Sequence, residues 1–206
     1  MSKTSPSRTG SPSAAGDLPH HMVTRGARRT PEEELVDFAR LQVRAGLLSS
    51  EAMLAEVIEA TKAEMPETDA SIMARAWLAG ARKDLVAEAV TWPAATDFDT
   101  LQAVFAECEQ HGVRVLQGVE DHWRAKASLE QDGSGLRGIM WFTQPDVWHA
   151  IDEGMLEVNL WHASTANAAP GDHLLSAVLS CFSWHGLSAR FDEGRIEVSA
   201  FWHRRP

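Results

Sequence analysis

Apolar residues recur three or four positions apart between residues 30 and 93, the spacing typical of amphipathic helices. Thr30, followed by a proline and two glutamates, gives the N-terminal cap signature of the first helix. Gly46, Pro66 and Pro93 interrupt the pattern, and glycine and proline commonly mark helix ends. The segment therefore predicts three consecutive helices.

Beyond residue 94 the pattern changes to short runs with a period of two, which predicts strands separated by turns and further helices. Asp192-Glu193-Gly194 lies between two such runs and indicates a hairpin. The predicted strands span residues 113–119, 136–143, 155–163, 187–191 and 195–202, and the predicted helices begin near residues 97, 144 and 172. The pattern predicts an α+β fold: an N-terminal three-helix segment, then a mixed sheet of about five strands with two or three packed helices.

Composition divides the chain into three parts. Residues 1–29 are rich in Ser, Pro, Gly, Thr and Arg. They hold too few large apolar residues to offset the entropy of ordering, which predicts a disordered tail. Residues 30–93 form the helical segment and residues 94–206 the sheet domain. We expect residues 30–206 to make one compact unit.

The strand at residues 155–163 has the clearest alternation. Leu156, Val158 and Leu160 are predicted to face the core, and the residues between them face the other way. Aromatic residues framed by acids on that second face would suit a protein partner. The alternative is that the helices of residues 31–91 cover this face. The candidate partner surface comprises Trp141, Glu157, Asn159, Trp161 and Phe201.

Charge is uneven along the chain. Residues 1–30 hold five basic residues and one acid, a net +4, whereas the whole chain carries −10, so residues 31–206 carry −14. A body this acidic repels phosphate backbones, which argues against nucleic-acid binding by the folded part. The sequence has no apolar run of the roughly 18 residues that a membrane span needs and no secretory signal pattern. We therefore expect a cytoplasmic protein with a protein partner and no membrane contact.

One acid–histidine cluster is a candidate for catalysis. Glu120, Asp121 and His122 follow the strand at residues 113–119, and loops at strand ends often carry function. The three side chains would suit a hydrated cation or a general base, which defines the alternative function, a metal-assisted hydrolase. A solvated turn explains the same residues, so the sequence favours a non-enzymatic protein-binding or regulatory module.

The positions of the two cysteines favour a structural role over a reactive one. Cys108 and Cys181 both fall on predicted amphipathic helices and are expected to pack as small apolar residues. Cys181 and His185 are four positions apart and could share a soft metal. The interpretation that the sequence favours is that Cys181 packs and His185 caps its helix. The sequence therefore predicts no metal site and no cofactor.

Several short motifs occur in combination: Trp92-Pro93, Thr96-Asp97, Leu101, Phe105, Gly112, Met140-Trp141-Phe142, residues 154–160 and residues 202–205. Together they resemble an uncharacterised family of bacterial, chiefly actinobacterial, proteins known as a domain of unknown function. The resemblance covers roughly residues 33–205. Many similar proteins carry a cysteine cluster after the first strand, but the matching residues 119–126 contain no cysteine. The resemblance therefore implies no activity and no metal site.

Overall fold

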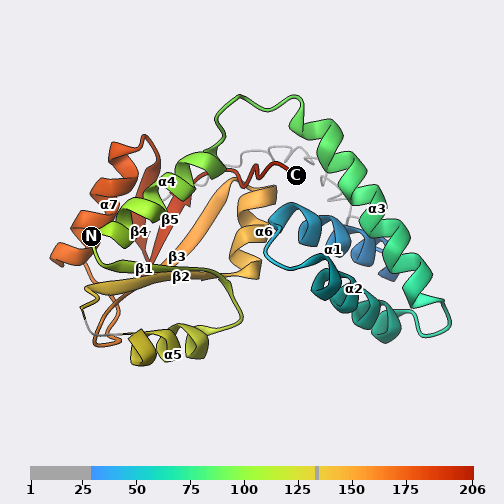
Figure 1. Cartoon of the computed structure of the whole chain (residues 1–206), viewed down its shortest axis with the longest axis horizontal. Helices are drawn as coiled ribbons and strands as arrows, with labels where there is room; N and C mark the ends of the chain where they lie inside the picture. The colour runs from blue at the N-terminus through green and yellow to red at the C-terminus, as the bar shows by residue number, and fades with distance from the viewer. Residues whose placement is uncertain (1–28, 133–134) are drawn as a thin grey trace, which may run out of the picture.

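The computed structural model describes residues 29–132 and 135–206 (Figure 1). The disordered tail predicted for residues 1–29 therefore lies outside the described residues, except for Arg29. Three helices come first, as the spacing predicts. They are α1 (Pro31–Ala45), α2 (Ser50–Glu64) and α3 (Ala70–Ala89).

Local hydrogen bonds explain where these helices begin and end. The Thr30 side chain accepts from the Glu33 backbone N–H, and the Glu33 side chain accepts from the Thr30 backbone N–H, which satisfies two donors at the start of α1. Gly46 ends α1 at φ 60°, a left-handed conformation that only glycine adopts at little cost. At the starts of α2 and α3, the Ser49 and Asp69 side chains accept from backbone N–H groups of the first turn, without the reciprocal contact that Glu33 makes in α1. The predicted boundaries of α1 are thus confirmed, and α2 ends before Pro66, as predicted.

The sheet domain follows, with its elements in the order α4 (Asp97–Gln110), β1 (Val113–Val119), α5 (His122–Asp132), β2 (Gly138–Thr143), α6 (Gln144–Asp152), β3 (Met155–His162), α7 (His173–Trp184), β4 (Ser188–Asp192) and β5 (Arg195–Ser199). The spatial strand order is β1-β2-β3-β5-β4. β1 and β2 run parallel, and the other neighbours run antiparallel. The α+β class and the mixed five-stranded sheet are therefore confirmed.

The first face of the sheet carries the main core. Leu156, Val158 and Leu160 of β3 are buried there, as their alternation predicts. They pack in one apolar cluster with residues of α4, α6 and α7. Helices α4 and α7 cover this face side by side in Figure 1.

Helix α5 is the main difference from the predicted elements. It lies on the second face, below β1 and β2 in Figure 1, where Ala125 and Leu129 pack on Ile139 and Trp141. Its eleven residues hold few large apolar side chains, so the periodic signal is too weak to predict it.

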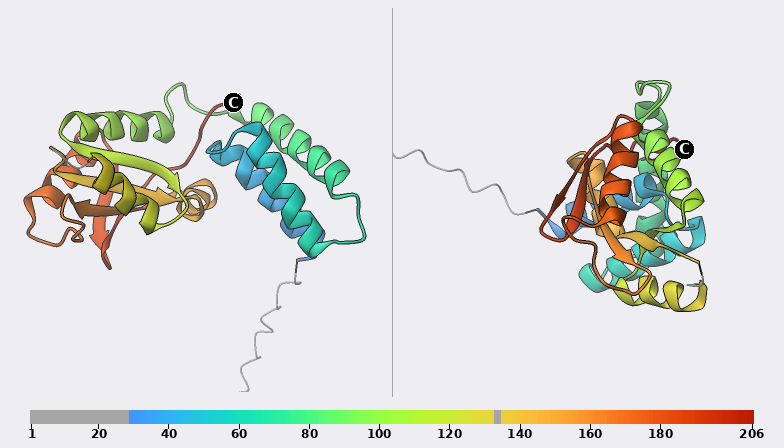
Figure 2. Two further views of the ribbon diagram at one scale, coloured as in Figure 1. Left: turned by 60° about the horizontal axis from the view of Figure 1, so that its bottom comes forward. Right: turned by 90° about the vertical axis from the view of Figure 1, so that its left-hand side faces the viewer.

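The N-terminal helices do not cover the second face of the sheet. They pack on one another and, through α1, on α6, so they lie beside the sheet domain in Figure 1 and in the left view of Figure 2. The alternative that residues 31–91 cover this face is therefore wrong. α5 covers part of it.

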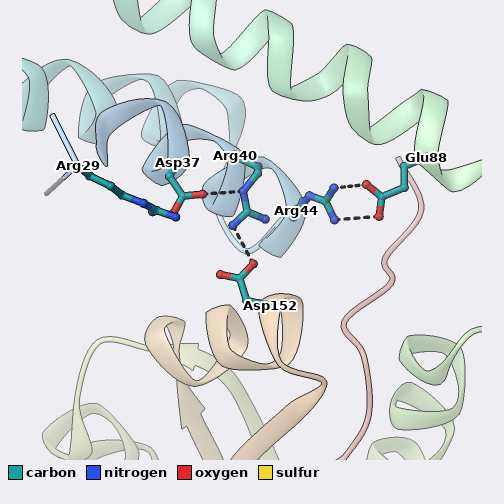
Figure 3. Close-up of polar contacts among 6 residues, drawn as sticks. All are labelled: Arg29, Asp37, Arg40, Arg44, Glu88 and Asp152. Atoms are coloured by element: carbon teal, nitrogen blue, oxygen red, sulfur yellow. Dashed lines mark hydrogen bonds and ion pairs between the residues drawn. The ribbon is translucent and has the colours of Figure 1, made fainter. Parts of the chain in front are cut away.

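Polar contacts join the helical segment to the sheet domain (Figure 3). Arg40 on α1 donates to Asp37 at 2.7 Å and to Asp152 at the end of α6 at 2.8 Å. The Trp202 indole N–H donates to the Ala45 carbonyl at 3.1 Å. The exposed ion pair therefore joins α1 to α6, and the buried indole contact joins the end of α1 to the C-terminal segment.

Candidate functional site

A groove of about 380 Å³ opens between α4 and α7. A volume of this size is within the usual range for ligand-binding sites. The groove walls are largely apolar, with Leu174 and Val178 from α7. Glu107 from α4 and Cys181 from α7 add polar and thiol groups.

The periodicity of α7 explains this arrangement. Leu174, Val178 and Cys181 are four and three positions apart, so they lie on one face of the helix. Trp184 is the last residue of α7 and also lines the groove, yet it is 86% exposed. His185 follows as the C-cap, and its backbone N–H donates to the Cys181 carbonyl at 3.2 Å. The groove therefore ends at an exposed indole.

Three potential metal ligands from two helices meet at the edge of this groove. The His185 Nε2–H donates to Glu107 Oε2 at 2.7 Å. One ligand atom from each of Glu107, Cys181 and His185 lies within 4.8 Å of the other two. Among the residues that the structure describes, this is the one such group of three His, Cys, Asp or Glu side chains.

Both cysteines of the groove favour the neutral thiol. Burial raises the pKa of Cys108 to about 12, and Cys108 is only 4% exposed. Burial also raises the pKa of Cys181. Because the thiolate is the nucleophile, neither cysteine is activated for covalent chemistry here. Cys108 packs in the core as the sequence predicts.

The acid–histidine cluster at the end of β1 is an ordinary helix start. The Asp121 carboxylate accepts from the backbone N–H groups of Trp123 at 2.9 Å and Arg124 at 3.1 Å, which satisfies free donors at the first turn of α5. Glu120 and His122 are exposed, and the His122 ring contacts Trp123. A catalytic role for Glu120, Asp121 and His122 stays a prediction.

Four of the five partner-surface candidates share the second face of the sheet. Trp141 pairs with Asn159 across β2 and β3, and Trp161 and Glu157 have the same orientation along β3. Trp141, however, lies under α5 and is 7% exposed, so it contributes to the core beneath this face. Trp161 is half-buried and meets Trp141 edge-on, with the ring centroids 5.1 Å apart.

Phe201 lies apart from these residues. Ser199 pairs with Met155 at the start of β3, whereas Trp161 is near the end of that strand, roughly 20 Å away at ~3.3 Å per residue. The Phe201 ring stacks on His203, with the centroids 5.2 Å apart. The five candidates therefore do not form one surface patch. The binding role of the exposed members stays a prediction.

A family model described as "Domain of unknown function (DUF6891)" matches residues 28–206. The chain belongs to this family. Neither the curated proteins nor the solved structures yield a match. The matched span of this DUF6891 member includes both walls of the α4–α7 groove. Within residues 29–132 and 135–206, no helix has the length and apolar character that crossing a bilayer requires.

The residues that sequence reasoning missed are Glu107 and Trp184. Glu107 is 78 residues from His185 in the chain, so no local spacing could connect the two. Trp184 had a usable signal, because it falls three positions after Cys181 at the end of an apolar helix. Its 86% exposure, in contrast, is a tertiary property that no local spacing shows.

Proposed function

We propose that this protein is a non-enzymatic binding module that holds a protein partner in the α4–α7 groove. The observation that carries this proposal is Trp184, an 86% exposed indole at the rim of an apolar groove. Exposed tryptophan beside a concave apolar surface is the arrangement that dominates the energetics of many protein–protein interfaces.

The contrast with other tryptophans supports this view. Trp141 and Trp202 are 7% and 3% exposed and pack in the core, which accounts for them structurally. Folding gains little from a side chain as exposed as Trp184. A partner that covers the indole would bury much of the 150–250 Å² typical of an aromatic side chain (an approximate range).

Charge defines the chemistry of the partner. Residues 31–206 carry a net charge of −14, so a basic partner associates faster and with fewer unfavourable contacts than an acidic one. The groove adds an apolar subsite between the helices. The partner that fits is therefore a basic protein segment that inserts an apolar side chain beside Trp184.

Affinity capture with matched variants tests the proposal. Wild-type protein, Trp184→Ala and Trp123→Ala are immobilised, exposed to extract of the native host and compared by quantitative mass spectrometry. Trp123 is the control because it is also exposed, at 61%, but lies on α5 away from the groove. Substitutions at such exposed positions change stability by only about 0.5 kcal/mol, so unfolding does not explain a loss.

The expected result is a basic protein retained by wild type and by Trp123→Ala, and reduced at least tenfold with Trp184→Ala. Direct titration with that purified protein must rank the three proteins in the same order, with the weakest affinity for Trp184→Ala. Equal capture by all three proteins contradicts the proposal. Loss with a Trp161→Ala variant alone would move the binding surface to the second face of the sheet.

The competing function, metal-assisted hydrolysis by Glu120, Asp121 and His122, has less support. The Asp121 carboxylate is occupied by two backbone N–H groups of α5. The three side chains also fall outside the one ligand group found among the described residues. The geometry thus favours the binding module.

A further inference from the structure

We propose that Glu107, Cys181 and His185 form a binding site for one divalent transition-metal ion of the zinc type. The site joins the C-terminal ends of α4 and α7. The sequence argues against a metal because Cys181 and His185 alone supply two ligands. The structure adds Glu107 from the other helix.

The donor set matches the chemistry of zinc. A cysteine sulfur, an imidazole nitrogen and a carboxylate oxygen are its three common protein ligand types. Hard cations such as Mg²⁺ and Ca²⁺ prefer oxygen ligands alone. Cys181 and His185 therefore select a softer ion.

The three ligand atoms need only small shifts to coordinate one ion. Ligands of a tetrahedral zinc ion are roughly 3.3–3.8 Å apart, given bonds of about 2.0–2.3 Å. The three ligand atoms here already lie within 4.8 Å of one another. Glu107 Oε2 and His185 Nε2 are 2.7 Å apart and must separate slightly to bind one ion. The two side chains are 38% and 24% exposed, so they have room to rotate.

Three protein ligands leave the fourth position of a tetrahedral ion unfilled. Glu107 and Cys181 line the groove, so a water molecule can reach that position. Three protein ligands with water in the fourth position are an established zinc coordination, whereas structural sites have four protein ligands. The burial that raises the pKa of Cys181 is overcome when the metal takes the thiolate.

Metal binding does not depend on the proposed partner. Trp184 contributes no ligand, so Trp184→Ala is expected to retain the ion while it loses the partner. The two experiments are therefore independent. A missing cobalt band would contradict the metal site, and a missing partner would contradict the proposed function.

Cobalt(II) spectroscopy on the full chain tests the site. The reduced, chelator-stripped protein is titrated with Co²⁺ and then with Zn²⁺. We expect a thiolate-to-cobalt charge-transfer band and tetrahedral d–d bands that saturate at one equivalent and disappear as Zn²⁺ displaces Co²⁺. Absence of the charge-transfer band in the wild-type protein overturns the proposal.

Variants assign the ligands. Cys181→Ser is expected to remove the charge-transfer band, and His185→Ala and Glu107→Ala to weaken Co²⁺ binding at least tenfold. His111→Ala is the matched control, because His111 lines the same groove but is outside the ligand group. It is expected to leave the affinity for Co²⁺ unchanged, because His111 supplies no ligand.

Far-UV circular dichroism establishes that each variant is folded, and His185→Gln replaces His185→Ala if the latter is not. A charge-transfer band that survives in folded Cys181→Ser, or an equal loss with His111→Ala, contradicts the ligand assignment.

Discussion

The burial of Trp161 is intermediate between that of a core residue and that of a surface residue. Trp161 is half-buried, and its edge-on contact with Trp141 is 5.1 Å between centroids. Truncation of a buried tryptophan typically costs about 3–5 kcal/mol, and an aromatic pair adds about 0.5–1.5 kcal/mol. We predict that Trp161→Ala lowers the free energy of unfolding by about 2–3 kcal/mol, measured by urea unfolding.

Trp184→Ala is the comparison for that measurement. Because Trp184 is 86% exposed, its loss should change the free energy of unfolding by no more than about 0.5 kcal/mol. If Trp161→Ala has an equally small effect, Trp161 is a surface residue and returns as a binding candidate.

Of the candidate site, the sequence indicates only the two residues that are close together in the chain, Cys181 and His185. The four-residue spacing of Cys181 and His185 is visible in any helix. Glu107 joins them because α4 and α7 lie next to each other on the sheet, a tertiary contact that spans 78 residues. No pattern in a single sequence encodes such a contact.

Helix α5 determines which part of the second face is covered. Leu129 is 4% exposed and packs with Ala125 on Trp141. We predict that Leu129→Ala destabilises the protein by about 2–5 kcal/mol in chemical denaturation, the range for a buried leucine. Trp123→Ala on the same helix should have little effect. Equal effects of the two variants would show that α5 does not pack on the sheet in solution.

An ion pair links α1 and α3 and makes stability depend on pH. Hydrogen bonding by Arg44 lowers the pKa of Glu88 (Figure 3). A carboxyl whose folded pKa is lowered contributes stability above its unfolded pKa, ~4.3, and loses it as the pH falls through the folded pKa. We predict that Glu88→Gln lowers the melting temperature at pH 7 and has a smaller effect at pH 3.

The contact is partly exposed, so the shift in melting temperature should be modest and should decrease with added salt. Glu59→Gln on α2 is the control, since Glu59 pairs with its neighbour Lys62 in the same helix and not across two helices among the described residues. An equal pH dependence in both variants contradicts the role of the Arg44–Glu88 pair.

The elements differ in how well the sequence predicts them. β3 is predicted because Leu156, Val158 and Leu160 alternate strictly with polar residues, and burial follows this pattern. α1 is predicted because Thr30 and Gly46 mark its two ends. α5 is missed because its contact with the sheet rests on two residues, Ala125 and Leu129, which are too few to define a period.

The C-terminal segment of the sheet domain makes hydrogen bonds to the helical segment. The Trp202 indole binds the Ala45 carbonyl, and Arg205 near the C-terminus binds the Pro93 carbonyl at 2.6 Å. We predict that residues 30–206 unfold in one cooperative transition. Native-state hydrogen exchange should then give the same opening free energy for protected amides of α3 and β3. Exchange of α1–α3 at a much lower free energy would indicate two independent units.

Site-specific photo-crosslinking in the host tests whether the α4–α7 groove holds a protein partner. Ala177 is exposed and lines the groove, whereas Ala79 is exposed on α3. A photo-crosslinking residue at position 177 should give a discrete adduct with one basic protein, and Trp184→Ala should abolish it. The same adduct from position 79, or an adduct at 177 that persists with Trp184→Ala, would show that the partner does not bind in the α4–α7 groove.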